Sequence, residues 1–153
     1  MIRITQSEPQ SRSNGNMTMI GKQTQTLDAT AICKDIDQWP QSWAGFPHDV
    51  PVGDKLVDLF KDFLNQQIAN GRARSTIKRH ADYLWILGGE IIRQICNDDE
   101  DDEAYTLSGK TLLLQYIGDD GGPYWHDAPS EQELTAYDSV CRLLYKWMIQ
   151  SDS

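Results

Sequence analysis

The segment FLNQQIANGRARSTIKRHADYL, Phe63–Leu84, decides how this chain folds, because it holds the end of one helix, a turn and the start of another. Before the turn, apolar residues recur at three- and four-residue spacing, which is typical of a helix with one buried face. Asn70-Gly71 is a typical helix stop. After it, Ser75 is the predicted N-cap of the next helix. The segment therefore predicts two consecutive amphipathic helices.

Both helices extend outward from this segment. The first is predicted to begin at Asp54, a good capping residue. The second continues as one apolar stripe from Ile77 to Ile95, with Gly88-Gly89 in its middle. Two glycines cost a helix about 1–2 kcal/mol relative to alanine. We therefore expect this pair to let another helix approach closely, or else to kink its own helix.

Two more helices and a different N-terminal part complete the predicted fold. A short helix is expected at 110–117, and the capping box 130–133 opens a long last helix. Residues 1–19 are polar and predict a disordered leader. Residues 20–52 predict an irregular aromatic strap, and residues 53–150 the helical domain. The predicted fold class is all-α, a compact four-helix bundle with an irregular aromatic N-terminal strap.

The composition suits one domain with a packed core. The chain has 153 residues, 39% of them hydrophobic, and five Trp, which is enough for a single domain and too little for two. The strap is expected to bury Trp39, Trp43 and Phe46 against the helices. The predicted core consists of Phe60, Phe63, Leu84, Trp85, Ile91, Leu113, Tyr137, Leu144 and Trp147.

No pattern in the sequence indicates catalysis, a metal or a cofactor. The three histidines, His48, His80 and His126, lie outside any metal-ligand spacing and are expected at the surface or an interface. Glycine loops that bind phosphate and nucleophile motifs are also missing from the sequence. The three cysteines are expected to be buried free thiols. Their odd count, together with the lack of a secretory signal and of a long apolar run, predicts a cytoplasmic protein with no membrane contact.

Charge is distributed very unevenly along the chain. The formal net charge is −9; residues 1–80 hold ten Lys/Arg and eight Asp/Glu, whereas residues 81–153 hold four and fifteen. Six acids in a row, 98–103, follow the second helix, where they repel one another and oppose the helix macrodipole, so a solvated loop is expected. Against this background, residues 71–80 hold four cations and no acid.

The cations of residues 71–80 form the candidate binding site. They surround the predicted start of the second helix, where unpaired amides and the positive end of the dipole favour an anion. Phosphate of duplex DNA is the expected ligand. The expected contact residues are Arg72, Arg74, Ser75, Thr76, Lys78 and Arg79. The alternative is that these cations only pair with carboxylates of the same molecule, either Asp49, Asp58 and Asp62 or the acidic loop.

Three motifs also carry a family resemblance: FLxxQIxxG at 63–71, RSTIKRHADYL at 74–84 and RLLYKWM at 142–148. They resemble the core-binding, or SAM-like, domain of phage integrases and other tyrosine recombinases. The resemblance implies about four helices that clamp one face of DNA, with the turn before the second helix touching phosphates. The chain stops where the catalytic domain of that family would begin. We therefore expect a non-catalytic DNA-binding or DNA-associated module, of the kind that mobile elements carry.

An acidic protein-interaction module is the alternative function. Such a module could be an antitoxin-like partner, an adaptor or an inhibitor that imitates nucleic acid, and it would meet a basic partner protein. Its expected contact residues are the acids Asp98, Asp99, Glu100, Asp101, Asp102 and Glu103, together with the strap residues Trp39 and Trp43 if these are exposed.

Overall fold

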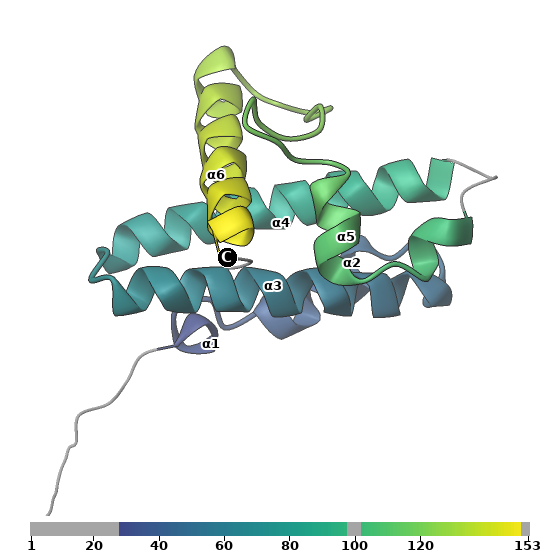
Figure 1. Ribbon diagram of the computed structural model, residues 1–153, viewed down its shortest axis with the longest axis horizontal. Coiled ribbons are helices and arrows are strands. Elements are labelled where there is room, and N and C mark those ends of the chain that lie inside the picture. The colour runs from purple at the N-terminus through teal and green to yellow at the C-terminus, as the bar shows by residue number, and fades with distance from the viewer. Residues whose placement is uncertain (1–27, 98–101, 151–153) are drawn as a thin grey trace, which may run out of the picture.

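The computed structural model describes residues 28–97 and 102–150, and within these ranges the fold is all-α (Figure 1). Two long helices lie side by side. The short helices α1 and α2 cover them on one side, and the short α5 and the long, steeply crossing α6 cover them on the other. The α-helices are α1 (Ala29–Ile32), α2 (Trp39–Trp43), α3 (Val50–Ala69), α4 (Arg74–Asn97), α5 (Gly109–Leu114) and α6 (Glu131–Gln150). The 3-10 helices are η2 (Ile36–Gln38), η3 (Pro47–Asp49) and η4 (Asp102–Tyr105).

The two long helices begin earlier than their predicted caps. α3 starts at Val50, so Asp54 is an exposed residue inside the helix and not its cap. Pro51 occupies the first turn, where the lack of an amide proton costs nothing. α4 starts at Arg74, so Ser75 is the second residue of the helix and the prediction of Ser75 as its N-cap is wrong by two positions. Both helices otherwise have the predicted extent.

The strap is less irregular than predicted. Between Ala29 and Asp49 it folds into α1, η2, α2 and η3, and α1 and α2 pack on α3. Helices of three to five residues are too short to show an apolar period, which is why the sequence pattern did not indicate them. Trp39 is buried as expected and Trp43 is half-buried, but Phe46 is 56% exposed, so its predicted burial is wrong.

The glycine pair of α4 accommodates the ring of Trp43. A Cβ built on Gly88 would lie 2.4 Å from two ring carbons of this tryptophan, far inside van der Waals contact. The Trp43 Nε1 donates to the carbonyl oxygen of Trp85 at 2.9 Å, and the Trp43 ring packs edge-on against Phe60. The glycines thus allow α2 to approach α4 closely, which is the first of the two explanations that the sequence left open.

The buried core agrees with the prediction at most positions. Trp85 is the error: its ring is 45% exposed, and its Nε1 donates to Ser42 Oγ at 3.3 Å. Trp147 is half-buried. Tyr83 and Leu87 are buried although they lie outside the predicted core. Both α2 and α6 pack on α4, so its buried surface is wider than a single apolar stripe.

Asp49 is the one carboxylate among the described residues that is almost fully buried. Its Oδ2 accepts from the amides of Gly45 and Phe46 and from the thiol of Cys96, and its Oδ1 accepts from the Tyr105 hydroxyl at 3.0 Å. Burial raises the pKa of Asp49, but these hydrogen bonds outweigh burial and hold that pKa below its usual value. Asp49 therefore ties the loop before α3 to α4 and η4.

The second half of the fold follows the predicted order. Ser130 caps α6, since its Oγ accepts from the Glu133 amide at 3.1 Å. The Glu133 carboxylate accepts from the Tyr83 hydroxyl at 3.0 Å, which links the start of α6 to α4. α5 begins at Gly109, capped by Ser108, and ends at Leu114. The predicted leader, 1–19, lies outside the described residues.

Candidate nucleic-acid interface

The turn between α3 and α4 positions the predicted cations. Gly71 has φ +83, a backbone conformation that glycine adopts without strain. Its amide donates to Ile68 O at 3.0 Å, and the amide of Arg72 donates to Gln67 O at 3.1 Å. This pair of bonds is a Schellman motif, which closes the last turn of α3 and reverses the chain. As a result, Arg72 lies in the turn itself and Arg74 opens α4.

The four cations of the turn face solvent. Arg72, Arg74, Lys78 and Arg79 are all exposed, as is Ser75, whereas Thr76 is half-buried. Within the described residues, no ion pair shorter than 4.0 Å involves any of the four cations. The predicted internal partner Asp49 is occupied by Gly45, Phe46, Cys96 and Tyr105 instead.

The start of α4 adds backbone donors to these cations. The Ile77 amide donates to Ala73 O at 3.0 Å and is the first amide satisfied within the helix. Among the described residues, no side chain accepts from the amides of Arg74, Ser75 or Thr76. Such amides, at the positive end of a helix of 24 residues, are ready donors for an anion.

A buried histidine, His80, joins α3 and α4 next to the turn. His80 is buried, which corrects the expectation of a surface or interface position for it. Its Nδ1 lies 2.9 Å from Gln67 Oε1 of α3, so the two helices are joined just behind the turn. Burial and the nearby cations of Arg72 and Arg79 lower the pKa of His80. The ring is therefore neutral at neutral pH, with Nδ1 donating to the glutamine oxygen.

Asp82 marks the edge of the positive surface on α4. It lies one helical turn after Lys78 and is exposed. Partial desolvation by the surrounding protein raises the pKa of Asp82, and the cation of Lys78 acts in the opposite direction. The two charges interact without forming an ion pair, so the ammonium group of Lys78 is still available to a ligand.

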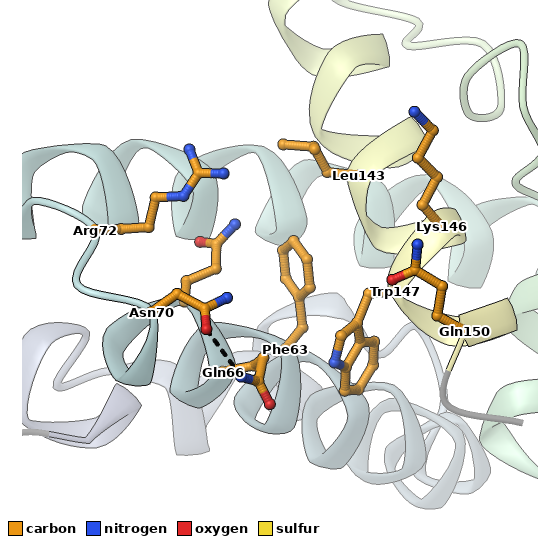
Figure 2. Close-up of a pocket in the computed structure, with 9 residues that line it drawn as sticks. Phe63, Gln66, Asn70, Arg72, Leu143, Lys146, Trp147 and Gln150 are labelled. Carbon is orange, nitrogen blue, oxygen red and sulfur yellow. Dashed lines mark hydrogen bonds between the residues drawn. The ribbon is translucent and has the colours of Figure 1, made fainter. Parts of the chain in front are cut away.

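A pocket of about 260 Å³ adjoins the turn, and Figure 2 shows its lining. Arg72 contributes from the turn and Lys146 from the last part of α6, and no carboxylate of the residues that the structure describes lines the pocket. Trp147 forms part of the wall, with its ring edge-on to Phe63 at 5.7 Å. Four of the remaining lining residues have amide side chains, Gln66, Gln67, Asn70 and Gln150, and the fifth is Leu143.

The sequence indicated only one side of this pocket. Lys146 and Trp147 belong to the RLLYKWM motif, in which Trp147 was expected to be core. Their approach to Arg72 depends on the angle at which α6 crosses α3, and no local pattern encodes that angle (Figures 1 and 2). The pocket thus extends the positively charged surface from Arg72 in the turn to Lys146 on α6.

The structure describes only some residues of the alternative interaction site. Trp39 is buried and unavailable to a partner. Glu103 is exposed, whereas 98–101 and the side chain of Asp102 lie outside the described residues. The predicted acidic contact surface therefore rests on sequence alone.

Chemical groups for other functions are sparse in the part of the chain that the structure describes. It contains no cluster of three or more His, Cys, Asp or Glu side chains that could hold a metal ion. All three cysteines are free, with Cys141 buried and the other two half-buried. No helix in the described ranges has both the length and the apolarity needed to cross a membrane.

Comparison with protein-family models, with curated proteins and with solved structures found no match to this chain.

Proposed function

We propose that this protein is a non-catalytic module that binds the phosphates of duplex DNA through the turn between α3 and α4. The observation that carries the proposal is the exposed group Arg72, Arg74, Lys78 and Arg79, which forms no ion pair with any described carboxylate. In an acidic protein, four cations left unpaired in one place favour an external anion as their partner.

Two further features support the same ligand. The uncapped amides at the start of α4 suit phosphate oxygens, which accept from backbone donors as well as from arginine and lysine. The resemblance to the core-binding domain of tyrosine recombinases points to the same turn as the phosphate contact. Contacts of this kind position a protein on DNA and carry no base information, so we expect binding with little sequence preference.

The salt dependence of binding tests the proposal. Each neutralised phosphate contributes about −0.9 to the slope of log K against log salt, so four contacts give a slope near −3.6. We would measure this slope by fluorescence anisotropy on a labelled duplex. The variant Arg74→Ala/Lys78→Ala/Arg79→Ala keeps only the phosphate contact of Arg72. Its binding should be much weaker, and the slope should become shallower, about −0.9.

A second triple variant controls for overall charge. Lys34→Ala/Lys61→Ala/Arg93→Ala also removes three positive charges, from other surfaces. It should bind DNA with nearly the wild-type slope. Equal losses in the two variants would mean that only net charge matters, and absence of binding at low salt would refute the DNA proposal. In the latter case, co-purification with a basic protein that is released by high salt would support the acidic interaction module instead.

A further inference from the structure

A second pocket lies on the middle of α4, away from the cations of the turn. Its volume is about 480 Å³, within the range of sites that hold small molecules or single side chains. Three tryptophans from separate parts of the chain line it: Trp43 of α2, Trp85 of α4, and Trp125 of the segment before α6. The other lining residues are Ile86, Gly89, Glu90, Arg93, Asp127 and Pro129.

Two of the three tryptophans that line the pocket already use their indole N–H groups as hydrogen-bond donors within the protein. Trp43 Nε1 donates to Trp85 O at 2.9 Å, and Trp85 Nε1 donates to Ser42 Oγ at 3.3 Å. Neither group is left to donate to an anion in the pocket. A ligand can meet these rings only through their faces and edges, and the face of an indole attracts cations.

The charged residues of the lining favour the same kind of ligand. The pocket is lined by two carboxylates, Glu90 and Asp127, and one guanidinium, Arg93. The Arg93 Nε lies 3.6 Å from Glu90 Oε1, so the one cation of the lining is engaged by an acid. Asp127 is exposed at 87%, and among the described residues only the His126 ring, charged only when protonated, lies within ion-pair distance of it, at 3.7 Å. The pocket therefore has a negative net charge.

The walls are held in place independently of any ligand. Trp43 is seated on Gly88-Gly89, and a Cβ at Gly88 would lie 2.4 Å from two carbons of its ring. Trp125 is buried and packs against Tyr83 and Tyr137, with ring centroids at 6.3 and 5.5 Å. Trp85 is the most exposed of the three, at 45%. Rigid walls reduce the entropy that a bound ligand must offset.

We infer that this pocket binds an organic ammonium ion by cation–π contact with the three tryptophans and by attraction to Asp127. The ligand can be a small quaternary amine or the ammonium group of a lysine on another protein, since both present the same charge on an apolar stem. This inference does not depend on the proposed DNA binding, because the residues involved are entirely different.

Choline and its neutral isostere 3,3-dimethyl-1-butanol provide a direct test. The two molecules have the same shape and differ in the positive charge. Binding to the full chain would be followed by tryptophan fluorescence and by saturation transfer to the methyl protons. We expect choline to bind at least tenfold more tightly than the alcohol. Equal affinity would show a merely apolar pocket, and failure of both to bind would show no site; either result overturns the inference.

Variants locate the bound cation. Trp85→Leu should weaken choline binding about tenfold, and Asp127→Asn a few-fold. Both side chains are exposed enough for the fold to survive, which circular dichroism would verify. Trp147→Leu is the matched control, since this half-buried tryptophan lies in the other pocket and should leave choline binding unchanged. Loss of binding in the control but not in Trp85→Leu would place the cation elsewhere and refute the assignment.

Short peptides distinguish the two sources of the ligand. A neutral peptide carrying one trimethylated or unmodified lysine should compete with choline if the natural ligand is a protein side chain. A peptide that fails to compete would restrict the site to small amines.

Discussion

Replacement of Gly88 by alanine should destabilise the protein, although alanine is the better helix former. The added Cβ would lie 2.4 Å from both Cη2 and Cζ2 of Trp43, whereas carbon atoms pack at about 3.5–4.0 Å. One of the two groups has to move by about 1 Å. Neither can do so freely, because Gly88 is part of the α4 backbone and the tryptophan ring is held by Trp85 O and Phe60.

The expected magnitude is the difference between opposing effects. Overpacking of this kind costs about 1–3 kcal/mol, and loss of the indole hydrogen bond costs about 1 kcal/mol more. Alanine returns about 1 kcal/mol of helix propensity. We therefore expect Gly88→Ala to lower the free energy of unfolding by about 2 kcal/mol. Gly89→Ala meets Trp43 at 3.3 Å, a contact that small shifts relieve, and should stay within about 1 kcal/mol of wild type.

Urea unfolding followed by far-UV circular dichroism measures both variants. A double-mutant cycle with Trp43→Leu completes the experiment, because a smaller side chain should remove most of the penalty of Gly88→Ala. If the two glycine variants were equally stable, or if Trp43→Leu left the penalty unchanged, close approach of the ring would not be the reason for the glycines. A kink in α4 would then be the better explanation.

Two further predictions concern pH. Asp49→Asn should lower the free energy of unfolding by about 2–4 kcal/mol at neutral pH, since charge-assisted hydrogen bonds are lost. Because the folded state lowers the pKa of Asp49, wild-type stability should decrease as the pH falls below about 3.9, the pKa of this group in the unfolded chain. In urea titrations at acidic pH, the stability of the wild type should then converge on that of the variant. The folded state also lowers the pKa of His80, so wild-type stability should decline as the pH falls below the unfolded value of about 6.5, and His80→Gln should lack this decline. A wild-type stability that is flat across either range contradicts the corresponding prediction.

The long helices could be predicted because each of them repeats its apolar pattern over many residues. α3, α4 and α6 have 20, 24 and 20 residues, enough turns for a period to be recognised. α1 and α2 have four and five residues, fewer than two full turns, and their folding depends on the surface of α3. The exposure of Trp85 could not be predicted from the neighbouring sequence, because an apolar residue next to the apolar face of a helix can lie either in the core or in the wall of a pocket.

The candidate site was predictable where it is local in sequence and unpredictable where it is not. The cations of the turn follow one another within eight residues, and the sequence places all of them at one helix start. By contrast, Lys146 joins Arg72 only through the packing of α6. Asp49 was considered as a counter-ion for the cations, but its partners Cys96 and Tyr105 are 47 and 56 residues away in sequence.

The acidic run 98–103 does not by itself prevent the proposed binding, because it follows Asn97, at the opposite end of α4 from the turn. α4 has 24 residues, so its rise of about 1.5 Å per residue separates Arg74 from Asn97, the residue before the acidic run, by roughly 35 Å. The Debye length is about 8 Å at physiological salt and about 30 Å at 0.01 M. In physiological salt, DNA phosphates at the turn are therefore largely screened from charges at the far end of α4. At 0.01 M salt, negative charges at that distance repel the phosphates. The slope of log K against log salt should therefore be near −3.6 at about 0.1 M salt and above, and should flatten at lower salt.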